Sequence, residues 1–140
     1  MNNRVAFFVP GAAAPQGSKR HVGRGVLIES SRAVGPWRER IAIIAHQAMR
    51  RAPAELFTGP TTIDLEFVMP RPKSASKTRV VAAVKRPDLD TLIRAVLDAL
   101  TDVCYRDDSQ VVGIKASKRL ALPGEGPGVA VTVTAEESAL

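Results

Sequence analysis

The feature that most constrains the fold is the alternation in residues 61–70, TTIDLEFVMP. Its apolar positions fall on one side of an extended chain: Ile63, Leu65, Phe67 and Met69. A period of two predicts a strand with one face in the core and the other outside, and Pro70 ends it. The covered face of such a strand requires a second layer packed against its sheet.

Two segments have the three- and four-residue spacing of helices that bury one face. The first is expected to begin near Pro36, because proline is favourable in a first helical turn, and to end before Pro53. Its apolar positions are Trp37, Ile41, Ile44, Ala45, Ala48 and Met49. The second runs from residue 89 to residue 100, with apolar positions at Leu92, Ile93, Val96, Leu97 and Leu100.

The remaining segments read as strands and loops. Residues 4–10 predict a first strand, residues 25–30 a short second one, and RVVAAV (79–84) a possible further one. Two late apolar stretches, at 110–122 and 128–135, flank the turn PGEGPG and predict a hairpin. The order of elements predicts one domain over residues 1–140, of the α/β (α+β) class, with one mixed sheet and two main helices.

The composition limits the compartment and the chemistry. A chain of 140 residues suits a single domain, and its one cysteine, Cys104, excludes a disulfide framework and a zinc site built from cysteines. The apolar run at the start is shorter than a signal peptide requires, and no stretch is long enough to span a membrane. We therefore expect a cytoplasmic protein that is not associated with a membrane.

Basic residues gather in two runs that contain no acid. Residues 71–86 hold six positive charges, as many as the net charge of +6 of the whole chain. The segment QGSKRHVGRG adds three more within a Gly- and Pro-containing stretch, residues 11–25, that predicts a flexible basic loop. Either run alone could be a solvated loop, but together they predict a surface that follows phosphates.

Two pairs of aspartates lie close to these basic runs. Asp88 and Asp90 stand at the entrance of the second helix, where capping accounts for one carboxylate but not for both. Asp107 and Asp108 follow that helix, where an Asp pair alone would indicate a turn. A strand returning beside the helix could bring the second pair to its entrance or to its end. Together the pairs offer oxygen ligands for Mg²⁺, which activates water in phosphodiester cleavage.

The stretch RPDLDTLIRAVLDALTDVCYRDDSQVV, from Arg86 to Val112, resembles the RusA family of Holliday junction resolvases from phages and prophages. The resemblance implies a homodimeric endodeoxyribonuclease that depends on Mg²⁺, with Mn²⁺ as a possible substitute, and needs no nucleotide cofactor. It would resolve four-way junctions and related branched DNA by paired nicks, in recombination, repair and phage DNA processing.

The resemblance also implies the roles of individual residues. Asp88, Asp90 and Asp108 would be catalytic metal ligands, with Asp107 assisting. Arg94 stands where the family commonly has a lysine, and Thr91 where it has asparagine or lysine. We expect Arg94 to bind the cut phosphate, although Arg and Lys are not equivalent. The expected DNA-binding residues are Lys19, Arg20, Arg24, Arg71, Lys73, Lys77, Arg79, Lys85, Arg86, Lys118 and Arg119.

Two alternatives remain open from the sequence. The segment DLDTL (88–92) also fits the nucleophile motif of phosphatases similar to haloacid dehalogenases, but that motif should follow a buried apolar strand, and here a basic stretch precedes it. The other alternative is a non-catalytic protein that binds DNA junctions, whose acids only cap and form turns. It accounts for the charge but not for two clustered acid pairs.

Overall fold

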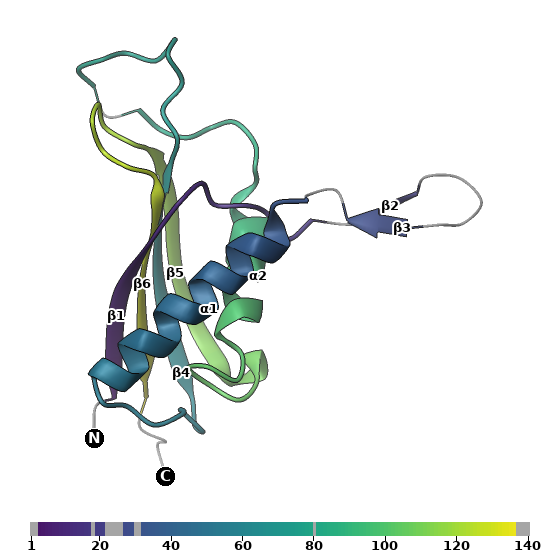
Figure 1. The fold of residues 1–140 in the computed structure, drawn as a ribbon, viewed down its shortest axis with the longest axis vertical. Coiled ribbons are helices and arrows are strands. Elements are labelled where there is room, and N and C mark those ends of the chain that lie inside the picture. The colour runs from purple at the N-terminus through teal and green to yellow at the C-terminus, as the bar shows by residue number, and fades with distance from the viewer. Residues whose placement is uncertain (1–2, 18, 22–26, 30–31, 80, 137–140) are drawn as a thin grey trace.

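The computed structural model describes residues 3–17, 19–21, 27–29, 32–79 and 81–136. The helices are α1 (Val34–Arg51) and α2 (Leu89–Leu100), and a short 3₁₀ turn, η1, spans Asp108–Gln110. The strands are β1 (Arg4–Pro10), β2 (Lys19–His21), β3 (Leu27–Glu29), β4 (Thr61–Met69), β5 (Val111–Leu120) and β6 (Gly128–Ala135). The predicted mixed sheet with two helices is confirmed (Figure 1).

The main sheet has the strand order β1-β6-β4-β5. β6 is antiparallel to both β1 and β4, whereas β5 is parallel to β4. The predicted hairpin of β5 and β6 is therefore wrong, because β4 lies between these strands. The connection 121–127 crosses two strand spacings, about 10 Å, which seven residues readily span. β6 takes the central position because its valines are all buried, whereas β5 carries charged residues suited to an edge.

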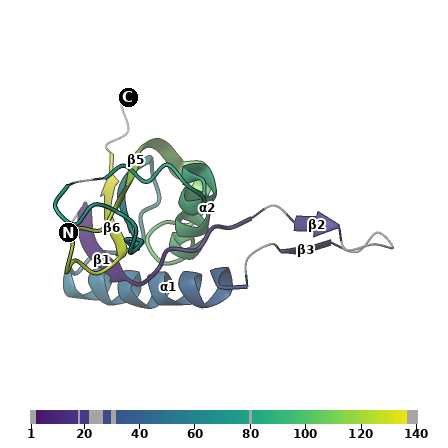
Figure 2. The ribbon, with the colours of Figure 1, turned by 90° about the horizontal axis from the view of Figure 1, so that it is seen from above.

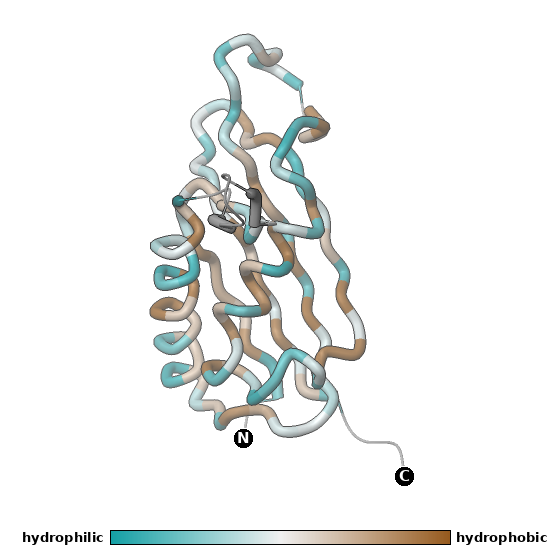
Figure 3. The backbone as a smooth tube through the Cα atoms, turned by 90° about the vertical axis from the view of Figure 1, so that its right-hand side faces the viewer, coloured by the Kyte–Doolittle hydropathy of each residue, from teal (hydrophilic) through white to brown (hydrophobic). Residues whose placement is uncertain are grey.

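Both helices cover the same face of the sheet (Figure 2). The predicted inward residues of β4 are all buried there, and the buried positions of α1 and α2 complete the core. Figure 3 shows the resulting apolar stretches along the strands and on the helical turns. The opposite face of the sheet carries Asp64, Glu66, Lys115 and Thr132, which line shallow grooves.

The turn after α2 is anchored by two buried residues. The Tyr105 hydroxyl donates a hydrogen bond to the Leu97 carbonyl at 2.7 Å, and Tyr105 is fully buried. Cys104 is fully buried beside it, and burial raises the pKa of its thiol to about 12. Cys104 therefore serves as an apolar filler of the core. These contacts hold the chain that leads to β5 against the C-terminal end of α2.

The N-terminal basic region is not a loop throughout. β2 and β3 pair with each other in a separate two-stranded sheet, away from the main one, whereas the sequence analysis expected every strand in one sheet. Just before β2, the Gln16 N–H donates to the Thr91 carbonyl at 3.0 Å, and its side-chain amide donates to Asp98. The segment that leads to β2 is thereby attached to α2.

The possible strand at 79–84 forms only a single bridge, between Ala82 and Arg119, in the part of it that the structure describes. No helix among the described residues has the length and apolarity needed to cross a membrane.

Candidate active site

The Asp88 carboxylate does not cap α2, although Asp88 is the residue that precedes the helix. Its carbonyl oxygen accepts the hydrogen bonds that close the first turn, from the Thr91 hydroxyl at 2.9 Å and the Leu92 N–H at 3.2 Å. The Asp90 carboxylate accepts one bond, from the Thr91 N–H at 2.9 Å. Both aspartates are exposed. Helix capping therefore does not explain the Asp88 carboxylate.

The second acid pair lies on a turn held by Gln110. The Gln110 side-chain oxygen accepts from the N–H groups of Arg106 and Asp107, each at 2.9 Å. Its amide nitrogen donates to the carbonyls of Phe57 and Gly59, at 2.9 and 3.0 Å. Four hydrogen bonds from one side chain fix the turn against the segment before β4. Gln110 belongs to the sequence motif 86–112, but only these contacts with Phe57 and Gly59 show that it anchors the turn.

Asp107 and Asp108 interact closely enough to perturb each other. The Ser109 N–H donates to Asp107 at 3.0 Å and, with the hydrogen bond that Asp107 shares with Asp108, lowers the pKa of Asp107. The same shared bond raises the pKa of Asp108, and burial and the negative charges of Asp107 and Asp98 raise it further. Two exposed carboxylates that repel each other in this way form a site that a divalent cation would stabilise.

The two acid pairs lie at opposite ends of α2. Asp88 precedes its first residue, and the Tyr105 hydroxyl ties the chain before Asp107 and Asp108 to Leu97 in its last turn. A helix of 12 residues is about 18 Å long. The described residues of one chain accordingly contain no group of three acidic, histidine or cysteine residues placed to hold a metal ion. The returning strand thus brings the second pair to the end of the helix, not to its entrance.

Lys118 fixes the loop that carries the first pair. Its ammonium group donates to the carbonyls of Lys85 and Pro87, both at 2.8 Å. Lys118 lies near the C-terminal end of β5 and faces the helices, as Phe67, its partner in β4, does. This contact places the entrance of α2 beside the end of β5, and the acid pair of Asp107 and Asp108 precedes the start of the same strand.

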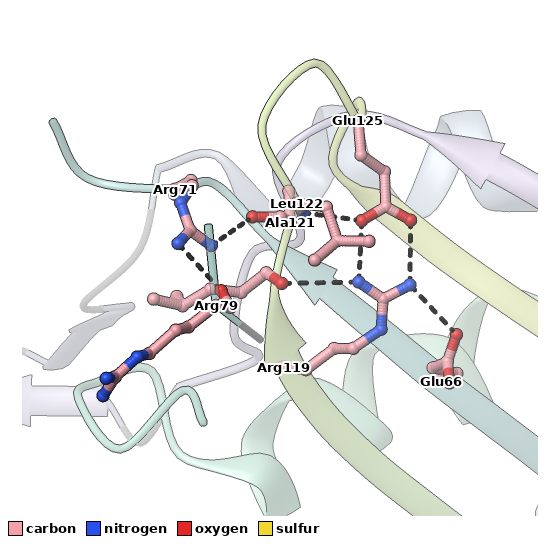
Figure 4. Close-up of polar contacts among 8 residues, drawn as sticks. Glu66, Arg71, Arg79, Arg119, Ala121, Leu122 and Glu125 are labelled. Atoms are coloured by element: carbon pink, nitrogen blue, oxygen red, sulfur yellow. Dashed lines mark hydrogen bonds and ion pairs between the residues drawn. The ribbon is translucent and has the colours of Figure 1, made fainter. Parts of the chain in front are cut away.

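The predicted DNA-binding residues fall into three groups. Lys73, Lys77, Arg79, Lys85 and Arg86 are exposed along the loop from β4 to α2. Three other basic side chains already have partners. Lys118 donates to the carbonyls of Lys85 and Pro87. Arg71 donates to the carbonyls of Ala121 and Arg79, and Arg119 pairs with Glu125 and Glu66 (Figure 4). Lys19 and Arg20 lie on β2, and Arg24 lies outside the described residues. Their DNA contacts stay a prediction.

Arg94 is exposed on α2, one turn after Asp90. Among the described residues it forms no ion pair with Asp90 or Asp98, which lie four residues before and four residues after it on α2. Asp98 instead accepts the bond from Gln16. The Arg94 guanidinium is thus available for an external anion.

The pair of Arg119 and Glu125 predicts a pH dependence of stability. The guanidinium donates two bonds, at 2.7 and 2.8 Å, and with the Leu122 N–H lowers the pKa of Glu125 from 4.5 to about 2. The stabilisation is present above the ordinary pKa and is lost as the pH falls through the window from 4.5 to about 2. We expect the free energy of unfolding to fall less steeply through this window in Glu125→Gln than in the unaltered protein.

Urea denaturation at a series of pH values measures this difference. Glu55→Gln is the control, because Glu55 is exposed and forms no ion pair with any described residue. Parallel curves for the Glu125→Gln variant and the unaltered protein would contradict the prediction.

Comparison with known proteins assigns the chain to a family. Residues 10–134 match the family described as Endodeoxyribonuclease RusA, which is nearly the whole chain. The chain belongs to the RusA endodeoxyribonuclease family. The predicted family is thereby confirmed, and this assignment replaces the phosphatase alternative. The matched region contains both acid pairs, Gln110 and Lys118.

This RusA chain is similar in sequence to the uncharacterized protein YqaN of Bacillus subtilis (strain 168). The two sequences are 33% identical over 91 residues, which is 59% of this chain. The matched region spans 62% of the relative, less than two thirds of its length.

Proposed function

We propose that the protein is a metal-dependent endodeoxyribonuclease that resolves four-way DNA junctions and related branches by paired nicks. Membership of the RusA family, an endodeoxyribonuclease family, carries this proposal. The exposed acids and the exposed basic loop 71–86 support it, because hydrolysis of DNA needs ligands for a cation and positive charge for the phosphates.

The chemistry of the donor set fits Mg²⁺, or Mn²⁺ in its place. Asp88, Asp90, Asp107 and Asp108 present only carboxylate oxygens, which hard divalent cations prefer. The Asp88 carboxylate has no capping bond, and Asp107 and Asp108 repel each other. When bound, the cation would supply Lewis-acid activation of water and neutralise the developing charge on the phosphate. Arg94 would bind and orient that phosphate from the adjacent turn of α2.

We propose further that each site is shared between two chains. The two acid pairs lie toward opposite ends of α2, and the described residues of one chain bring no three acidic side chains together as metal ligands. A two-fold dimer in which the entrance of one α2 meets the end of the partner's α2 joins the first pair of one chain to the second pair of the other. This arrangement creates two equivalent sites, as two opposed nicks in a junction require.

The free edge of β5 is the surface best suited to such a dimer. β5 is the last strand of the sheet, and two apolar side chains near its start are exposed, Val112 at 66% and Ile114 at 44%. On the side of β5 away from β4, the described residues form backbone contacts only at the C-terminal end of the strand, where the Leu120 N–H donates to the Val81 carbonyl at 3.1 Å. An uncovered edge of this kind is a template for another strand.

Antiparallel pairing of two β5 edges sets the start of each strand beside the end of its partner. The start of β5 follows Asp107 and Asp108, and its end carries Lys118, which holds the loop before Asp88. The same pairing would therefore cover Ile114 and bring the separated acid pairs together.

The test of the function is cutting of a labelled synthetic four-way junction with Mg²⁺ or with EDTA. We expect paired nicks that require Mg²⁺, and a loss of at least about 100-fold in Asp90→Asn, because even outer partners of metal ligands are worth roughly 10- to 100-fold. Asp64→Asn is the matched control, an exposed carboxylate on β4 that faces away from the helices.

Junction binding is measured on the same samples. Binding without cutting, in both Mg²⁺ and Mn²⁺, would select the alternative of a non-catalytic junction-binding protein. Equal binding of linear and four-way DNA would contradict the junction specificity.

A further inference from the structure

An apolar hollow of about 540 Å³ lies beside the entrance of α2. Its walls come from the loop between β4 and α2, from the end of β5 and from the segment after β1. The apolar lining includes Ala12, Pro70, Pro72, Ala82, Val84 and Leu120. This volume lies within the range of sites for small molecules, roughly 300–1,000 Å³.

Hydrogen bonds from two basic side chains hold the walls in place. Lys118 donates to the carbonyls of Lys85 and Pro87, both of which line the hollow. Arg71 donates to the carbonyls of Ala121 and Arg79 at 2.9 and 3.0 Å and so joins the start of the loop to its middle (Figure 4). The hollow is therefore formed before any ligand arrives.

The charges and the position of the hollow indicate its ligand. Lys85 and Arg86 are the charged residues of its lining, and both are exposed cations. Pro87, at the same wall, directly precedes Asp88. A ligand that fits would combine an apolar body with an attached anion, which the two cations would hold close to the acid pair. A nucleotide has this chemistry.

We propose that the hollow binds one unpaired nucleobase at the branch point of the DNA, next to the phosphate that is cut. Lys85 and Arg86 would hold the phosphates on either side of it, while the prolines and aliphatic side chains enclose the base. Bases at a branch point are the least costly to extrude, because their pairing and stacking are already weakened. This proposal rests on the proposed function, and it gives the enzyme a means of selecting the nucleotide beside the cut.

The test uses four-way junctions that carry 2-aminopurine at each position around the branch point. Fluorescence is measured with the Asp90→Asn protein, which should bind without cutting, and binding is followed by anisotropy in the same sample. We expect a several-fold rise in fluorescence at one or two positions only. The fluorescence should rise because stacking in DNA quenches this base, whereas the described residues that line the hollow include no aromatic side chain.

Two variants fill the hollow from different segments of the chain, Ala82→Trp and Ala12→Trp, each at an exposed alanine. Both should lose the fluorescence rise and, in an otherwise unaltered chain, cut roughly 10- to 100-fold more slowly, because a misplaced reacting group costs about that much. Their affinity for the junction should be nearly unchanged. Ala6→Trp, at an exposed alanine on β1 outside the hollow, is the matched control.

Three results would overturn the proposal. One is an unchanged signal at every position from a protein that binds and cuts the junction normally. Another is normal cutting by both filled variants. The third is loss of the dimer in the filled variants, which would assign the hollow to a contact between subunits. Failure of the unaltered protein to bind or cut junctions would instead remove the proposed function, and the two failures are therefore distinguishable.

Discussion

A mixture of two inactive variants, Asp90→Asn and Asp108→Asn, is expected to regain nuclease activity. In a mixed dimer with shared sites, one site contains both substitutions and the other contains none. The intact site joins the unaltered acid pair at the entrance of α2 in one chain to the unaltered pair after α2 in its partner. With random assortment, about a quarter of all sites are restored, from a background at least about 100-fold lower.

The product of the mixture is a second prediction of the same arrangement. Because a mixed dimer has only one intact site, it should nick one strand of a junction and leave the opposite strand uncut. Purification of mixed dimers through two different tags, followed by electrophoresis of strand-labelled junctions, measures both the rate and the pattern.

The control is the pair Asp88→Asn and Asp90→Asn, which alter the same acid pair. Every site of their mixed dimer contains one substitution, so no activity should return. Purified mixed dimers of Asp90→Asn and Asp108→Asn that stay inactive would contradict the shared site. Equal recovery of activity in the control would show that a site does not combine the first acid pair of one chain with the second acid pair of its partner.

Replacement of Gln110 by alanine is expected to destabilise the protein by about 2–4 kcal/mol, because a typical hydrogen bond contributes about 0.5–1.5 kcal/mol and four of them are lost. Gln110 makes four such bonds and joins the turn of Asp107 and Asp108 to the carbonyls of Phe57 and Gly59. For a chain of 140 residues this lowers Tm by roughly 6–12 °C.

Chemical and thermal denaturation measure this effect, and nuclease assays well below the lowered Tm measure the loss of positioning. Gln47→Ala is the matched control, because Gln47 is exposed on α1 and makes no side-chain hydrogen bond to a described residue. A Tm for Gln110→Ala within a degree or so of the control would show that the turn holds its shape without this anchor.

The elements were largely predictable, because their signals are local. The alternation of β4 and the apolar stripes of α1 and α2 mark buried faces that need no knowledge of the neighbours. The pairing of strands was not predictable in the same way. The link PGEGPG looks like a hairpin turn, yet β6 pairs with β1 and β4, because its fully apolar inner face is best buried in the centre of the sheet.

The sequence by itself determined the family, the candidate acids and the basic loop, since these follow from residue types at fixed spacing. Only the tertiary structure decided that α2 separates Asp88 from Asp108 and that Lys118 and Gln110 position the two acid turns. It also decided that β5 lies at an edge of the sheet and that β4 separates it from β6. The physical reason is that spacing along a chain does not give distance in space: a helix keeps its two ends apart, and a returning strand brings together residues that the sequence places far from each other.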